Sequence, residues 1–566
     1  MIVTPSKSPA HGRAMAVTNH PAASAAAAMM LAEGGTAVDG AVAGLLALSV
    51  CEPMMVGLFG GGVFHLRDAA GAHTIFDGLS TAPAAAHATM FKPARPDDPL
   101  EIEAEGRANT LGALSVAVPG NLLAWTAALA REGRFSLADV LQPAIRLARR
   151  GFTVSHYLAD CAAEVAGDLA CDAAIAALFL PGGQPVRAGA TLRNPALAET
   201  LEAIAAGGAG VLHGGAVGAS AVAGIAARGG MLTLADLAGQ RMVERAPIRG
   251  TYRGFEVLGP PPPSAAGVHV VQMLNLLEGF DIGAMGFGSP AHLHLVAEAL
   301  RLAFADRAAA TADPAFITVP VERLISKAYA AERRAELDLT RTRAWPAGVS
   351  PGEAHTTHLT VADSEGCVVA ATHTINSLFG ARFLLRETGL IPNNYMALFN
   401  PRPGLANSIA PGKRVTTSMS PLMILKDGAP WAALGLPGGL RIFASTFQAV
   451  LNLIDHGMSL SQAVEAPRIW TQGGELEVEA GFPDETRAAL AAKGHATRNV
   501  PVVAGGMCAI RFHDGGMLEG AACWRADGTP IGIAGGPARA GVRFFPDARP
   551  GAPPGIPPGI PPGIPA

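Results

Sequence analysis

A threonine pair followed by a histidine, Thr356-Thr357-His358, lies far from both ends of this 566-residue chain. A threonine hydroxyl is a weak nucleophile unless a base lies beside it, and one such base is the residue's own α-amine after the preceding peptide bond is cut. A free α-amine titrates at about 7.7–8.0, so part of it is unprotonated near neutral pH. The tripeptide also suits the start of an ordinary strand. Its chemical interpretation is a chain that cuts itself between His355 and Thr356 and then uses Thr356 as its nucleophile.

The residues that follow predict a β-hairpin over 356–374, with its turn at 363–366. An antiparallel register set by that turn brings Thr374 and Asn376 within side-chain reach of Thr356. These two residues are therefore candidates for holding the nucleophile in place.

A second predicted hairpin, over 422–436, leads into Pro437-Gly438-Gly439 and a strongly periodic helix. Glycines at the N-terminus of a helix expose backbone N–H groups toward an anion. Such donors commonly form an oxyanion hole, where one donor is worth about 10²–10³ in rate. We predict that Gly438 and Gly439 have this role; a simple strand-to-helix turn is the alternative.

Further motifs accompany these residues in a fixed order. They are Glu52-Pro53, Gly60-Gly61-Gly62, Leu302-Ala303-Phe304-Ala305-Asp306-Arg307, Thr374-x-Asn376, Asn393-Asn394, Thr417-Ser418-Met419-Ser420-Pro421 and Pro437-Gly438-Gly439-x-Arg441. With Thr356-Thr357-His358 they resemble the gamma-glutamyltranspeptidase family, also called the glutathione hydrolase family, whose members are N-terminal-nucleophile hydrolases. The resemblance covers residues 14–535, which is nearly the whole chain.

The resemblance implies an α+β fold, the αββα four-layer sandwich of two stacked antiparallel sheets with helices outside. Self-cleavage would leave a large subunit, 1–355, and a small catalytic subunit, 356–540, which remain together as a heterodimer with one shared core. The segment 541–566 repeats Pro-Pro-Gly-Ile. Such a composition favours extended, solvated backbone, so a disordered tail is expected.

The resemblance also implies a mechanism without a metal or organic cofactor. Thr356 Oγ would attack the carbonyl of a small-molecule amide, while the α-amine of Thr356 accepts and later returns the proton. The Gly438 and Gly439 N–H groups would hold the oxyanion, and Thr374 and Asn376 would position the nucleophile. Water or an acceptor amine would then resolve the acyl-enzyme.

The substrate-binding positions depart from the family pattern. The typical member clamps a zwitterionic γ-glutamyl group with an arginine, a Gln or Glu, an Asp and a Ser-Ser pair. Aligning the motifs places Leu79, Tyr395 and Leu398 at the first three positions, whereas Thr417 and Ser418 preserve the pair. Hydrogen bonds to charged groups contribute about 1.5–3 kcal/mol each. We therefore expect an acyl group that carries a carboxylate but no ammonium.

Two further features concern that acyl group. Arg382 or His373, near the open end of the hairpin, could anchor its carboxylate, although surface positions are an equal alternative. The loop 400–411 is shorter than the lid of typical family members, which predicts a more open pocket.

Composition excludes several other classes of function. A net charge of −4 without a basic cluster argues against nucleic acid, and the longest strongly apolar run, 41–51, is too short to cross a bilayer. The polar start, 1–13, shows no secretory signal, so a cytoplasmic location is expected. Six scattered cysteines predict reduced thiols and no metal site, and His292 and His294 lie on different faces of a predicted helix.

Two alternatives stay open at this point. The chain could be a conventional gamma-glutamyltransferase or glutathione hydrolase, or a non-catalytic binding module of the same fold. The complete set of Thr356, Thr374, Asn376 and the glycine pair favours an enzyme.

Overall fold

The hairpin that carries Thr356 lies at the centre of one of two large sheets. The structure is a computed structural model that describes residues 1–98, 100–345 and 355–533. In these ranges the chain forms two sheets of seven strands each, and all neighbouring strands in them are antiparallel. The first sheet has the order β19 (Thr529–Ile533), β2 (Ala14–Thr18), β10 (His355–Ala362), β11 (Val368–Asn376), β3 (Gly61–Arg67), β4 (His73–Asp77) and β7 (Val243–Arg245). The second has the order β1 (Ala10–Gly12), β18 (Leu518–Ala522), β17 (Cys508–Phe512), β13 (Ala429–Gly435), β12 (Leu422–Lys426), β9 (Phe255–Gly259) and β8 (Ile248–Tyr252).

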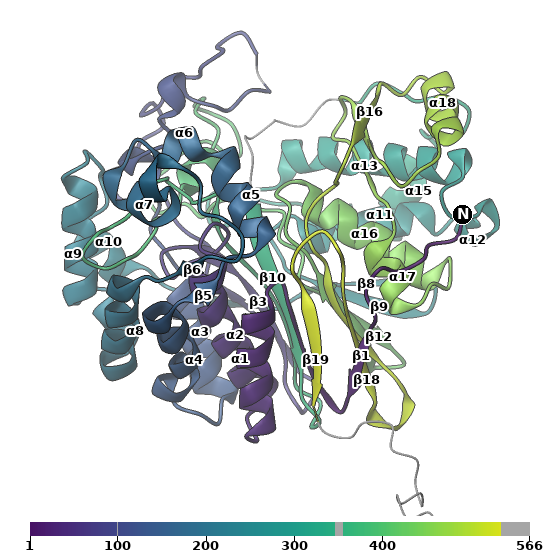
Figure 1. Ribbon diagram of the computed structural model, residues 1–566. Coiled ribbons are helices and arrows are strands. Elements are labelled where there is room, and N and C mark those ends of the chain that lie inside the picture. Colours follow the sequence, from purple (N-terminus) through teal and green to yellow (C-terminus); the bar gives the residue numbers. More distant parts are fainter. Residues whose placement is uncertain (99, 346–354, 534–566) are drawn as a thin grey trace, which may run out of the picture. The chain divides into compact units, whose positions relative to one another are not determined.

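Helices cover the outer face of each sheet (Figure 1). Those on the side of the first sheet are α1 (Pro21–Ala32), α2 (Ala37–Cys51), α3 (Asn121–Glu132), α4 (Leu137–Arg150), α5 (His156–Glu164), α6 (Ala166–Leu169), α7 (Ala173–Phe179), α8 (Pro195–Gly207), α9 (Ala216–Ala226) and α10 (Leu234–Gly239). Those on the side of the second are α11 (Ala266–Leu277), α12 (Ile282–Met285), α13 (Pro290–Ala310), α14 (Val321–Leu324), α15 (Lys327–Arg334), α16 (Arg441–Ile454), α17 (Leu460–Glu465) and α18 (Asp484–Ala492). Two small sheets, β14 (Ile469–Trp470) with β15 (Leu476–Glu479) and β16 (Thr497–Val500), and β5 (Phe152–Thr153) with β6 (Thr191–Leu192), complete the described strands.

The two large sheets pack face to face through small and medium apolar side chains. Met15 and Val17 of β2 and Val368 of β11 pack with Met423 of β12 and Ile510 of β17 in one buried cluster. Strands β10 and β11 are buried along their whole length after His355, because one face of the hairpin meets the other sheet and the opposite face meets α2. The predicted αββα sandwich is therefore confirmed.

Local sequence signals explain where the elements begin. Helix α2 starts at a capping box, in which the Asp39 carboxylate accepts a hydrogen bond from the Thr36 N–H at 2.7 Å. The predicted hairpins are present as β10–β11 and β12–β13, and the helix predicted after Gly439 is α16. Turn residues and the spacing of apolar residues thus predicted these strands and this helix correctly, and the observed ends differ from the predicted ones by one or two residues.

The predicted cleavage position divides both large sheets. Strands β2, β3, β4 and β7 of the first sheet precede it in sequence, whereas β10, β11 and β19 follow it. The second sheet takes β1, β8 and β9 from the earlier part and four strands from the later part. Neither part alone could form a complete sheet. The chain divides into the units Met1–Ala534 and Gly535–Ala566, and the tail predicted at 541–566 lies outside the described residues.

One segment, Ala209–Ala226, is apolar enough over 18 residues to pass as a membrane span by composition. In the structure a short 3₁₀ turn ends at Val211 and helix α9 begins at Ala216. Helix α9 has 11 residues, whereas a spanning helix needs about 20.

Candidate active site

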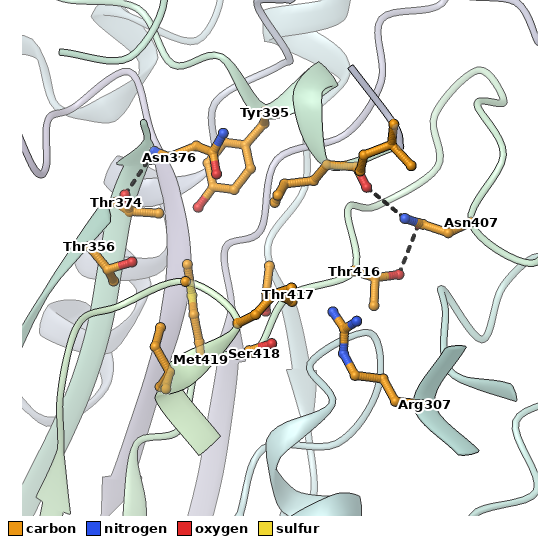
Figure 2. Close-up of a pocket in the computed structure, with 15 residues that line it drawn as sticks. Arg307, Thr356, Thr374, Asn376, Tyr395, Asn407, Thr416, Thr417, Ser418 and Met419 are labelled. Atoms are coloured by element: carbon orange, nitrogen blue, oxygen red, sulfur yellow. Dashed lines mark hydrogen bonds between the residues drawn. The ribbon is translucent and has the colours of Figure 1, made fainter. Parts of the chain in front are cut away.

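Thr356 lies where the pairing of β10 and β11 changes register. Thr357 pairs with His373 and His355 pairs with Asn376, with the shift between them. This places Thr356 beside Thr374, as the hairpin turn predicted. Thr356 is only 3% exposed, and it lines a pocket together with Thr374 and Asn376 (Figure 2).

The two neighbouring threonines have different environments. The Thr357 hydroxyl donates to the Glu52 carboxylate at 2.6 Å and is fully buried. The Thr356 side chain points into the pocket instead (Figure 2). Thr356 is therefore the hydroxyl that a substrate could reach.

Burial alters the protonation of Glu52, the carboxyl group that binds Thr357. It raises the pKa of Glu52 to about 8, because the charged carboxylate loses solvation, although the Thr357 hydrogen bond favours the charged form. The second carboxyl oxygen of Glu52 has no partner in the described part of the chain. Glu52 thus binds Thr357 of β10 mainly as a neutral carboxyl group up to neutral pH.

Thr374 holds the carbonyl of the bond that is predicted to break. Its hydroxyl contacts the His355 carbonyl oxygen closely, and also lies 3.0 Å from the Met55 carbonyl oxygen. The Asn376 N–H donates to the same hydroxyl at 2.7 Å. A donor on the His355 carbonyl can stabilise the oxyanion that forms when Thr356 Oγ attacks that carbon.

Asn376 is fixed by its backbone and by the pair Asn393-Asn394. Its φ of +82° lies in the left-handed region, where asparagine is one of the few side chains tolerated. Its side-chain amide donates to the Asn394 side-chain and backbone oxygens at 3.0 and 3.2 Å. Asn376 also lines the pocket.

Gly438 and Gly439 form the turn between β13 and α16. Their φ angles are +138° and +58°, and a Cβ on Gly438 would lie 2.5 Å from the Ala504 Cβ, so this turn requires glycine. Neither N–H donates to another backbone group in the described ranges. Gly439 lines the pocket, whereas Gly438, the residue before it, is not among the described lining residues. The turn is thus suited to hold an oxyanion.

Four of the five acyl-binding residues predicted from the sequence line the pocket. Tyr395, Leu398, Thr417 and Ser418 line the pocket, and the Tyr395 hydroxyl donates to the Gly61 carbonyl oxygen at 2.8 Å. Leu79 does not line it: the side chain is buried in an apolar cluster that also contains Tyr395.

Both proposed carboxylate anchors were wrong. Arg382 forms a close ion pair with Asp168, and His373 Nδ1 lies 2.7 Å from the Asn121 side-chain oxygen and 3.3 Å from the donating Trp125 indole nitrogen. Neither lines the pocket. Burial also lowers the pKa of His373 to about 3, so it is neutral near pH 7.

Other lining residues escaped the sequence reasoning. Arg307, Asn407 and Thr416 are the polar ones, and Ile102, Met419, Leu440 and Ile442 are the apolar ones. Asn407 belongs to the loop 400–411 and donates to the Leu398 carbonyl oxygen at 2.6 Å. Arg307 closes the motif Leu302–Arg307. A charged residue in the buried last turn of a long apolar helix was the signal that could have identified it.

One side-chain cluster in the described ranges has the composition of a metal site: His294, Glu298 and His495. His294 Nδ1 lies 2.7 Å from His495 Nε2, and His294 and Glu298 also bind the segment before the predicted cut. His294 Nε2 lies 2.7 Å from the Asp338 carbonyl oxygen, and Glu298 accepts from Thr342 Oγ1 at 2.6 Å. None of the three lines the pocket. All six cysteines are free thiols, of which Cys171 alone is exposed.

Comparisons with known proteins agree with this geometry. The profile of the gamma-glutamyltranspeptidase family matches residues 23–533. The acylase ACY 1 proenzyme of Pseudomonas sp. (strain SE83) is 57% identical over 540 residues, covering 95% of this chain and 97% of the relative. The glutathione hydrolase proenzyme of Escherichia coli (strain K12) is 38% identical over 483 residues, 82% of each chain. Among solved structures, cephalosporin acylase from Bacillus halodurans has a TM-score of 0.86 at 28% identity and covers 95% of this chain and 99% of its own.

Proposed function

Because the chain belongs to the gamma-glutamyltranspeptidase family, whose members act on amides after self-cleavage, we propose that Thr356 is its nucleophile and that its acyl substrate carries a carboxylate but no ammonium. The geometry of the β10–β11 hairpin supports Thr356 as the nucleophile. The charge of the pocket lining supports the choice of acyl substrate.

Maturation begins with attack of Thr356 Oγ on the carbonyl carbon of His355. The Thr374 hydroxyl stabilises the oxygen of that carbonyl while negative charge develops on it. The peptide C–N bond then breaks as the proton lost from Thr356 Oγ passes to the departing nitrogen, which leaves the His355 acyl group as an ester on Thr356 and frees the α-amine of Thr356. Water hydrolyses the ester, giving the carboxylate of His355 and the free hydroxyl of Thr356.

Turnover repeats the attack on an external amide. The new α-amine accepts the Thr356 hydroxyl proton and passes it to the departing amine, while the N–H groups of Gly438 and Gly439 stabilise the tetrahedral oxyanion. Water then attacks the acyl-enzyme and releases the acid; an acceptor amine in place of water gives transfer.

The observation that carries the substrate proposal is that no aspartate or glutamate is among the described residues lining the pocket, and Arg307 is its one charged side chain. An ammonium placed against Leu398 would be desolvated without a partner, which costs several kcal/mol. A carboxylate in the same pocket would meet a cation and hydroxyl groups instead. The acylase names of two of the relatives support the same direction.

Two p-nitroanilides test this proposal. Glutaryl-p-nitroanilide and γ-glutamyl-p-nitroanilide differ only in the α-ammonium of the acyl chain, so the ratio of their kcat/KM values measures its effect. We expect at least a tenfold preference for the glutaryl compound, which is about 1.4 kcal/mol. A tenfold preference for the γ-glutamyl compound would instead identify a conventional gamma-glutamyl hydrolase, and an uncut chain inactive on both would identify a binding module.

A further inference from the structure

Arg307 is a buried cation without a partner in the described part of the protein. It lies in the last turn of α13 and is 9% exposed. Its Nε has no hydrogen-bond partner, and no described carboxylate forms an ion pair with its guanidinium. The neighbouring Asp306 carboxylate binds the Tyr329 hydroxyl at 2.9 Å and the Gln272 side chain.

The environment leaves Arg307 charged. Burial lowers the pKa of Arg307 only to about 10, so the guanidinium keeps its proton at neutral pH. The adjacent His269 is neutral there, since burial lowers its pKa to about 4, and it binds Gln272 and Thr311 rather than an anion. A buried charge without a counter-charge destabilises a protein by several kcal/mol. A bound anion would remove that cost.

Two more polar groups beside Arg307 lack partners. Thr417 Oγ1 and Ser418 Oγ are buried without a hydrogen bond in the described structure. Backbone contacts fix their segment, because the Thr417 N–H donates to the Pro263 carbonyl oxygen at 3.2 Å and Thr417 accepts from the Ala265 N–H at 2.9 Å. Figure 2 shows the guanidinium turned toward this segment, with Thr356 on the opposite side of the pocket. A cation and two hydroxyl donors together match the oxygens of a carboxylate.

We propose that Arg307 binds the terminal carboxylate of the acyl chain and so selects dicarboxylic monoamides, with Thr417 and Ser418 donating to the same carboxylate. This assignment rests on the proposed function, because it takes Thr356 as the point of attack at the other end of the acyl group. Arg307 thereby supplies, from a helix, the charge that Leu79 does not supply.

The test compares glutaryl-p-nitroanilide with glutaramyl-p-nitroanilide, in which a terminal amide replaces the carboxylate at nearly the same size. The leaving group carries no carboxylate, so any charge preference belongs to the acyl side. Wild type should prefer the acid by about 10–100-fold in kcat/KM, which is about 1.4–2.7 kcal/mol, because only the acid can form a charge-assisted contact with Arg307. Arg307→Met should reduce that preference to threefold or less, mainly through KM, while still cutting itself. Arg307→Lys should retain at least a tenfold preference.

Arg301→Met is the matched control. Arg301 lies six residues earlier on α13 and is also buried, but its guanidinium donates to the Gly473 and Gly474 carbonyl oxygens and does not line the pocket. Its loss should leave the acid-to-amide preference within twofold of wild type.

The assignment of Arg307 is wrong if Arg307→Met lowers kcat/KM equally for the acid and the amide substrate. It is also wrong if Arg307→Lys and wild type show no preference for the acid. Wild type that prefers the acid while Arg307→Met keeps that preference would overturn this inference and leave the proposed function intact. Wild type inactive on both amides would overturn the proposed function itself.

Discussion

The two sides of the pocket satisfy their polar groups differently. On the nucleophile side Thr374 binds the His355 carbonyl oxygen, Asn376 binds Asn394, and Thr357 binds Glu52. On the acyl side the hydroxyls of Thr417 and Ser418 and the Nε of Arg307 have no partner in the described chain. Buried polar groups in proteins are normally paired. Apart from one carboxyl oxygen of Glu52 and His355 Nε2, the first side pairs its polar groups without substrate, whereas the hydroxyls and the cation of the second side are free to bind an anion.

This difference indicates how one fold can serve several substrates. The nucleophile side depends on strand register, a left-handed Asn376 and a glycine turn, so a change there affects the chemistry of every amide. The acyl side depends on single side chains projecting from different elements, and exchanging one of them alters recognition without moving the hairpin. The predictions below alter each side in turn.

The largest effect is expected for Thr356→Ala, which removes the attacking oxygen for both self-cleavage and turnover. A denaturing gel should show one full-length chain, and kcat on a hydrolysed p-nitroanilide should fall by at least about 10⁴-fold. Thr357→Val is the matched control. It should still break between His355 and Thr356, as mass spectrometry of the fragments would show, although the lost buried hydrogen bond lowers stability by about 1 kcal/mol. Cleavage of the Thr356→Ala chain at this bond would disprove the nucleophile assignment.

Thr374→Val tests whether the Thr374 hydroxyl assists cleavage through its hydrogen bond to the His355 carbonyl oxygen. Valine keeps the shape of threonine but cannot donate to the His355 carbonyl oxygen, so self-cleavage of freshly made protein should slow by about 10²-fold. The time course of the two fragments on a gel measures this rate. Thr372→Val, on the same strand, removes a hydroxyl that lies 2.8 Å from His358 Nδ1 and should change the rate by less than threefold. Equal slowing in both variants would point to general loosening of the hairpin.

Leu398→Asp alters the acyl side by a single charge. The new carboxylate can pair with the α-ammonium of a γ-glutamyl group and repels a glutaryl carboxylate. The ratio of kcat/KM for the γ-glutamyl and glutaryl p-nitroanilides should therefore rise by about tenfold, or about 1.4 kcal/mol, over that of Leu398→Asn. The asparagine variant has nearly the same size and separates charge from shape. An equal ratio in the two variants would show that position 398 does not approach the ammonium.

The same contrast explains what the sequence could predict. Capping boxes and turn residues are local, so α2, both hairpins and α16 were predictable, and the turn at 363–366 set the register that brings Thr374 beside Thr356. The acyl side is assembled from α13, the loop 400–411 and the segment 416–419, which lie far apart in sequence. Matching motifs identified position 79 but not its side-chain direction, and Leu79 packs into the core. The position of Arg307 in the last turn of an apolar helix was visible in the sequence, but its lack of partners was visible only in the structure.

The smallest effect on turnover at neutral pH, less than about threefold, is expected for Glu52→Gln. This variant tests the protonation of the carboxyl group that binds the Thr357 hydroxyl. Burial raises the pKa of Glu52 from 4.5 to about 8, so the folded protein holds this proton more tightly than the unfolded chain. The stability gained from that proton is fully present below pH 4.5 and is lost as the pH rises toward 8 and beyond.

Glutamine resembles the protonated carboxyl and does not titrate, so the Glu52→Gln variant serves as the reference. In urea unfolding of Thr356→Ala chains between pH 5 and 7, the chain that keeps Glu52 should lose stability relative to the chain that also carries Glu52→Gln, by about 1 kcal/mol per pH unit. Keeping the chain uncut removes subunit dissociation from the measurement. Parallel pH profiles would mean that Glu52 is ionised in the folded protein, and that Thr357 is then held by a charged acceptor instead of a neutral one.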